Sequence, residues 1–148
     1  MSIWIVVLVG VIGGLAGAMQ SQFLGVMEDK VGTLASTFVT YGGGGLAIGL
    51  LMLAFGGGQW SSLRELPWWV FTAGLMGLVV VASLGVTVNR LGLGAGLTLF
   101  TGATLVLAAL IDHFGWFTAA NTLDPRRVAG IAMVVLGTWL VVGGSATG

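Results

Sequence analysis

The sequence contains no cysteine, which excludes disulfide bonds, thiolate nucleophiles and thiolate metal sites together. Charged residues are also scarce: they make up 7% of the 148 residues, whereas a soluble domain carries roughly a quarter. Hydrophobic residues make up 57%, and a water-soluble surface cannot be built from that composition. The formal net charge is zero, so nothing points to nucleic acid as a partner. The composition therefore indicates an integral membrane protein.

Catalytic machinery is missing as well. His113 is the only histidine, so it cannot build a metal site, and no Ser/His/Asp or HExxH spacing occurs. The sequence therefore predicts no enzyme, no catalytic residue, no metal and no cofactor. Asp112 precedes His113, but adjacent residues on a helix point about 100° apart, so the pair is not a preformed dyad. We interpret it as a polar pair at a helix end, where interfacial anchoring or a turn is the simpler role.

The charges that do occur are confined to short clusters, and these clusters divide the chain into five uncharged stretches. Each stretch is about as long as the ~20 apolar residues that a helix needs to cross a bilayer. Lipid cannot satisfy backbone polar groups, so only helices and closed barrels span it, and long unbroken apolar runs are not barrel strands. We expect an all-α membrane protein, a single domain over 1–148, with helices at about 3–27, 32–55, 67–88, 92–111 and 127–145.

Glycines within the predicted helices follow small-xxx-small spacing, which permits close helix approach where there is little hydrophobic drive between helices. The first helix carries such glycines on one side, and the second and fourth each carry a pair. We interpret them as packing seams that would also let helices slide during a transport cycle. The glycines assigned to packing are Gly10, Gly14, Gly17, Gly45, Gly49, Gly92 and Gly96.

Polar side chains inside a membrane are costly, so their placement is informative. Several predicted helices carry one mildly polar stripe of Ser and Thr, and Gln20 lies on the glycine side of the first helix. Such hydroxyls could simply bond back to their own helix, which contributes about 0.6 kcal/mol each. Stripes on several helices together favour a polar pathway, with aromatic side chains that stack on the solute or gate it. The candidate pathway residues are Gln20, Ser36, Thr40, Tyr41, Trp69, Ser83 and Thr101.

Several segments together resemble the YdcZ-like family of small five-helix bacterial membrane proteins, within the drug/metabolite transporter superfamily. The most specific are the Pro-Trp-Trp start of the third helix and an Ile-Asp-His-Phe-Gly segment. The matching segments are Gln20, Leu66–Trp69, Gly74 with Gly77, Arg90–Gly92, Leu110–Gly115, Arg127–Gly130 and Gly137. The sequence departs from the family at Leu24, where Asn is common, and at Gly102–Ala103, where Gly-Gln is common. The resemblance implies a transporter of the bacterial inner membrane that exports a small metabolite or organic ion.

An odd number of helices places the two termini on opposite sides of the membrane. Orientation follows mainly from Lys and Arg near helix ends. One side would carry Arg64, Arg126 and Arg127, and the other Lys30 and Arg90, which is a weak bias. We therefore expect an antiparallel homodimer of ten helices, with dual topology and a substrate site between subunits, as in inverted-repeat transporters.

Two other functions fit the same sequence. A passive channel could form from the same dimer, or the protein could be a membrane scaffold that transports nothing. The absence of acidic residues near the middle of any predicted helix argues against proton exchange at an embedded carboxylate. It also favours a neutral, zwitterionic or anionic solute, although an aromatic box could hold a cation.

Overall fold

The computed structural model describes residues 2–58, 60–116 and 124–145. Within these ranges the chain is 93% helical and forms no strand. Four of its helices are long and apolar enough to cross a membrane. The composition and these helices are those of a multi-pass membrane protein, and the fold is all-α, as the sequence predicts.

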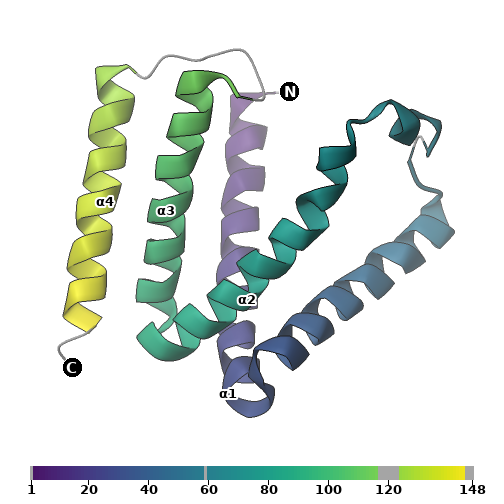
Figure 1. Ribbon diagram of the computed structural model, residues 1–148, viewed down its shortest axis with the longest axis horizontal. Coiled ribbons are helices and arrows are strands. Elements are labelled where there is room, and N and C mark those ends of the chain that lie inside the picture. Colours follow the sequence, from purple (N-terminus) through teal and green to yellow (C-terminus); the bar gives the residue numbers. More distant parts are fainter. Residues whose placement is uncertain (1, 59, 117–123, 146–148) are drawn as a thin grey trace.

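The first helix, α1 (Ile3–Phe55), is bent into two arms at Gly32. A straight helix of its 53 residues would extend about 80 Å, more than twice the hydrocarbon thickness of a bilayer. Gly32 has φ 78° and ψ 171°, a backbone conformation that is essentially restricted to glycine. We call this bend the elbow, residues 3–31 the N-terminal arm and residues 33–55 the C-terminal arm. The arms diverge from the elbow at the lower end of Figure 1.

The elbow lies later than the charged cluster at which the sequence suggested a turn. Glu28, Asp29 and Lys30 remain helical, because a charged residue at the membrane edge does not itself break a helix. The positive φ of Gly32 does break it. The two arms correspond to the first two predicted helices.

The remaining chain forms short 3₁₀ segments and three further helices. After η1 (Trp60–Glu65) and η2 (Trp68–Thr72), α2 (Ala73–Leu91) descends to the lower end, and α3 (Leu93–Phe114) returns. Gly115, with φ 63°, caps α3 in the left-handed conformation, so Asp112 and His113 belong to its last turn. The last helix, α4 (Pro125–Ser145), descends again. The sequence also suggests a short interfacial segment between α3 and Pro125, and most of these residues lie outside the described ones.

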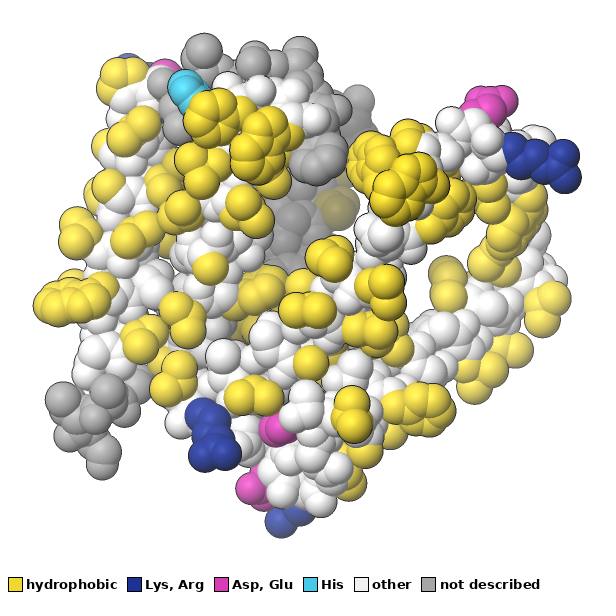
Figure 2. Space-filling model, viewed as in Figure 1, with side chains coloured by type: hydrophobic (Ala, Val, Ile, Leu, Met, Phe, Trp, Pro, Cys, Tyr) yellow, Lys and Arg dark blue, Asp and Glu magenta, His cyan; other side chains and the backbone are white. Residues whose placement is uncertain are grey.

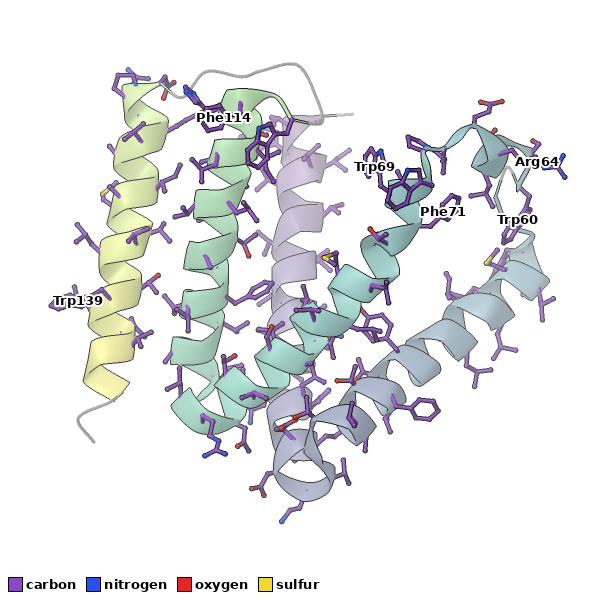
Figure 3. The ribbon with its side chains drawn as sticks, viewed as in Figure 1. Trp60, Arg64, Trp69, Phe71, Phe114 and Trp139 are labelled. Atoms are coloured by element: carbon purple, nitrogen blue, oxygen red, sulfur yellow. The ribbon has the colours of Figure 1, made fainter. Side chains whose placement is uncertain are left out.

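The two termini lie at opposite ends of the bundle, as an odd number of passes requires (Figure 1). Residues 64, 126 and 127 lie at the upper end, and residues 30 and 90 at the lower end. Trp60 and Trp69 also lie toward the upper end (Figure 3), where amphipathic indole rings suit the headgroup level.

The few buried side chains gather where α1 meets α2 and α3. Leu24 is 1% exposed and Val88 5%, and Ala95 of α3 is 3% exposed. By contrast, most of the large apolar side chains point outward (Figure 2). The chain exposes 10849 Å², whereas a compact monomer of its 15.1 kDa exposes about 7,100 Å². Lipid or another protein chain must cover this apolar surface.

Candidate functional site

The inner side of the elbow carries a carboxylate held by hydroxyl groups from the opposite arm. Thr33 Oγ1 donates to Glu28 Oε1 at 2.6 Å. Ser36 Oγ lies 3.4 Å from Glu28 Oε2 and 3.0 Å from the Thr33 carbonyl oxygen, so its single proton can be directed to either acceptor. Glu28 is half-buried and Ser36 is 1% exposed. These contacts connect the two arms across the break in the helix.

The lower half of α2 packs closely against the elbow, and glycines at the contact points allow this close approach. A Cβ at Gly85 would lie 3.4 Å from Glu28 Oε2, so the carboxylate fits directly against the α2 backbone. A Cβ at Gly25 would lie 2.7 Å from Val88 Cγ1, which is closer than real Cβ atoms approach. The Asn89 side-chain amide donates to the Gly25 carbonyl oxygen at 3.3 Å. The lower end is therefore a tightly packed joint.

Above this joint the C-terminal arm and α2 separate, and an opening remains between them in the space-filling view (Figure 2). Tyr41 of the C-terminal arm reaches α2, because its hydroxyl group contacts Gly77 with no room for a Cβ. Thr40 lies beside Tyr41 and donates to the Ser36 carbonyl oxygen at 2.9 Å. Trp69 lies on the chain that enters α2 at the upper end (Figure 3). The candidate pathway residues Ser36, Thr40 and Tyr41 thus belong to the C-terminal arm, and Trp69 belongs to η2, which leads into α2.

The three other candidate pathway residues are exposed in a single chain. Gln20 is exposed on the N-terminal arm, and Thr101 is exposed on α3. Ser83 is exposed on α2 and donates to the Val80 carbonyl oxygen at 2.9 Å, which is the back-bonding expected of a helical serine. A single chain does not bring these residues into one site, so their role stays a prediction for an assembly of two chains.

Asp112 borders a hollow of about 500 Å³ between α3 and α4, together with Arg127. The rest of its lining includes Leu105, Ala108 and Ile131, so the hollow is apolar away from its charged end. His113 is exposed and contacts the ring of Phe114 edge-on at 5.2 Å. This arrangement suits the membrane-edge role expected for the pair.

The glycines assigned to packing fall into two groups. A Cβ at Gly96 would lie 3.0 Å from the Val88 backbone nitrogen, so α2 and α3 approach closely there. Gly92 has φ 82° and forms the tight connection between these helices. The other predicted packing glycines have no neighbour of this kind within 4 Å, and their faces are open in a single chain: Gly10, Gly14, Gly17, Gly45 and Gly49.

Comparison with known families gives a result for almost the whole chain. The family model described as "Putative inner membrane exporter, YdcZ" matches residues 5–140. The protein belongs to the YdcZ family. No curated protein and no solved structure matches the chain. The family resemblance seen in the sequence is thereby confirmed, and the family is one of exporters rather than enzymes.

The two departures from the YdcZ pattern fall at helix contacts. Leu24 is among the most buried side chains, at 1% exposure. A Cβ at Gly102 would lie 2.8 Å from Thr138 Oγ1, where α3 meets α4. Thr138 also donates to the Thr98 carbonyl oxygen of α3 at 3.2 Å. In this YdcZ protein these positions serve helix packing.

Sequence reasoning missed Glu28 as a site residue, because it read the charged cluster as a turn outside the membrane. The structure retains Glu28 in the helix, four residues before the break, and turns the next arm back over it. The signal in the sequence was Gly32 followed by Thr33 and Ser36. Glycine allows the reversal, and the two hydroxyls fall on one helix face.

Proposed function

We propose that this YdcZ protein is a small secondary exporter that acts as an antiparallel homodimer. Its substrate is a small metabolite or organic ion, which binds between the two chains and crosses by alternating access. The observation that carries the proposal is the opening between the C-terminal arm, which carries Tyr41, and α2, which Trp69 precedes in the chain. The chain itself leaves this opening unfilled (Figure 2).

A second copy is the most economical occupant of this opening. The chain exposes roughly half as much surface again as a compact monomer of its mass. Its termini lie at opposite ends, so an inverted copy generates two inverted halves, and transporters of that plan bind substrate where the halves meet. The Lys and Arg residues divide three against two between the ends, which imposes little orientation.

The test has two stages, because the substrate must first be found. Purified protein is heated with metabolites and organic ions, and a bound ligand raises the unfolding temperature by mass action. The hit is then loaded into proteoliposomes. An exporter gives saturable flux and counter-exchange between labelled and unlabelled substrate. Flux that follows the gradient without saturation or exchange would indicate the channel and overturn the proposal.

Substitution separates a carrier from a scaffold. We expect Gln20→Ala to lower exchange, because Gln20 would face the second chain within the pathway. Gln22→Ala is the matched control, since Gln22 is also exposed but points roughly the opposite way on the same arm. Equal exchange in the two variants and the unmodified protein would remove Gln20 from the pathway.

A further inference from the structure

Most helical hydroxyl groups in the described residues bond back to their own helix, and the buried exception lies near the elbow. Ser21, Thr87, Thr98 and Thr104 each donate to the carbonyl oxygen four residues earlier, at 2.5 to 2.8 Å. Thr37 does not: its side-chain oxygen is buried and has no hydrogen-bond partner among the described residues. Thr37 is only 9% exposed, so water does not readily supply the missing partner. A buried polar atom left in this way needs an explanation.

Glu28 presents a complementary exception. The ion pair that the described residues form joins Lys30 to Asp29 at 3.7 Å, on exposed side chains. Glu28 is half-buried and takes part in no ion pair within the described part of the chain. A carboxylate at the membrane edge is therefore held by neutral hydroxyl groups alone.

Thr37 lies on the same arm as the two residues that hold Glu28. Thr33, Ser36 and Thr37 fall within about 100° of arc on the C-terminal arm, so they share a face. Thr33 and Ser36 both reach the Glu28 carboxylate, which fixes the direction of that face toward the N-terminal arm. The cluster adjoins Gly32, where the helix is broken. Broken helices in transporters are places where cations bind.

We infer that Glu28, Thr33, Ser36 and Thr37 form a binding site for a monovalent metal cation, with Na⁺ as the expected ion. The site offers two carboxylate oxygens and three hydroxyl oxygens, a donor set typical of hard cations. Its single negative charge matches one positive charge. The Thr33 hydroxyl proton turns away from the carboxylate when the ion binds, because hydroxyl protons rotate to suit their surroundings.

The unpartnered Thr37 hydroxyl group favours a metal cation over a proton as the ligand of this site. A proton on Glu28 needs no additional oxygen ligand, and Thr37 would stay unpartnered. A metal cation uses the Thr37 oxygen lone pairs and balances the carboxylate in the same step. An ion that joins both arms of α1 would bias the angle between them. The inference thereby deepens the proposed function, and the role of the ion in coupling rests on that function.

The test measures the unfolding temperature of the purified full-length protein in detergent, as NaCl replaces choline chloride at constant ionic strength. We expect the temperature to rise with Na⁺ and to saturate. Thr37→Val keeps the side-chain shape and should weaken the apparent Na⁺ affinity about tenfold or more, as loss of a supporting group does at other metal sites. Glu28→Gln should abolish the response.

Thr104→Val is the matched control, because Thr104 is exposed on α3 and bonds back to its own helix at 2.8 Å. It should respond to Na⁺ like the unmodified protein. Equal unfolding temperatures in NaCl and choline chloride would overturn the inference, and so would a Thr37→Val variant with an unchanged Na⁺ response. A response to pH without one to Na⁺ would assign the site to a proton instead. If Glu28→Gln does not fold, the Na⁺ responses of Thr37→Val and Thr104→Val still test the inference.

This result is separable from the proposed function. Na⁺ binding with no export of any solute would overturn the exporter and leave the cation site standing. Export that proceeds without any Na⁺ response would overturn the cation site alone.

Discussion

The lower and upper ends of this molecule differ in how tightly their helices pack. At the lower end the elbow, α2 and the start of α3 interlock through Gly25, Gly85 and Gly96, each against a neighbouring side chain or backbone. Toward the upper end the C-terminal arm and α2 separate (Figure 2), and in the N-terminal arm Ile3–Leu15 every residue is exposed. The lower end is complete within one chain, whereas the upper part presents glycines with nothing against them. The comparison indicates that the glycine contacts at the lower end stabilise the fold of one chain, whereas the open glycine faces are available for contact with another chain.

The largest effect on the fold of one chain should come from Gly96→Leu. A Cβ there would already lie 3.0 Å from the Val88 backbone nitrogen, so the α2–α3 joint must open. We expect a loss of about 3 kcal/mol in the free energy of unfolding, measured by denaturant titration in detergent. Gly94→Leu on the same helix has open space and should cost far less. Equal losses would show that the lower joint is not specially packed.

Gly32→Ala should have the next largest effect. Its φ of 78° with ψ of 171° is strained for any residue with a Cβ, at about 1–3 kcal/mol. We expect a lower free energy of unfolding together with a changed distance between spin labels on the two arms. Gly42→Ala is the control, since Gly42 is helical with open space around it and alanine favours helix there. A Gly32→Ala variant with an unchanged free energy of unfolding and an unchanged label distance would argue that the elbow does not depend on this residue.

Asn89→Ala should have a smaller effect. It removes the hydrogen bond from the Asn89 amide to the Gly25 carbonyl oxygen at the joint. Interhelical hydrogen bonds in membranes average about 0.6 kcal/mol, and we expect a loss of that order in the unfolding titration. A loss several times greater would mean that Asn89 has a further role at the elbow.

Gly14→Leu should have the smallest effect on a single chain and the clearest effect on the assembly. No neighbour lies within 4 Å of a Cβ at Gly14, so the unfolding free energy of the monomer should hardly change. If the open glycine face packs against a second chain, the fraction of cross-linked dimer should fall sharply. An unchanged dimer fraction would show that the interface lies on another face of the chain.

Much of the fold could be predicted from the sequence. The uncharged runs mark the membrane-crossing helices, because lipid imposes the same length requirement on each of them. The position of the elbow could not be predicted from charge. Lys30 and its neighbours read as a turn, but the break depends on the backbone conformation of Gly32 and the packing of the arms around Glu28.

The candidate site was less predictable for a related reason. Ser36 and Tyr41 were found because a polar side chain in an apolar run is conspicuous. Which of them meet depends on the angle between the arms, and this angle is a tertiary property. Gln20 and Thr101 stay apart in one chain, and sequence periodicity cannot say what a second chain brings to them.

Labelling from the two sides of the membrane tests the antiparallel dimer most directly. The chain has no cysteine, so Ser61→Cys at the exposed upper end gives a unique reporter. In intact cells, a maleimide that cannot cross the inner membrane should label about half of the molecules, because three against two positive charges barely choose an orientation. An added Ser62→Lys should shift this fraction strongly to one side. Labelling of all molecules or none, unchanged by the added lysine, would contradict the account.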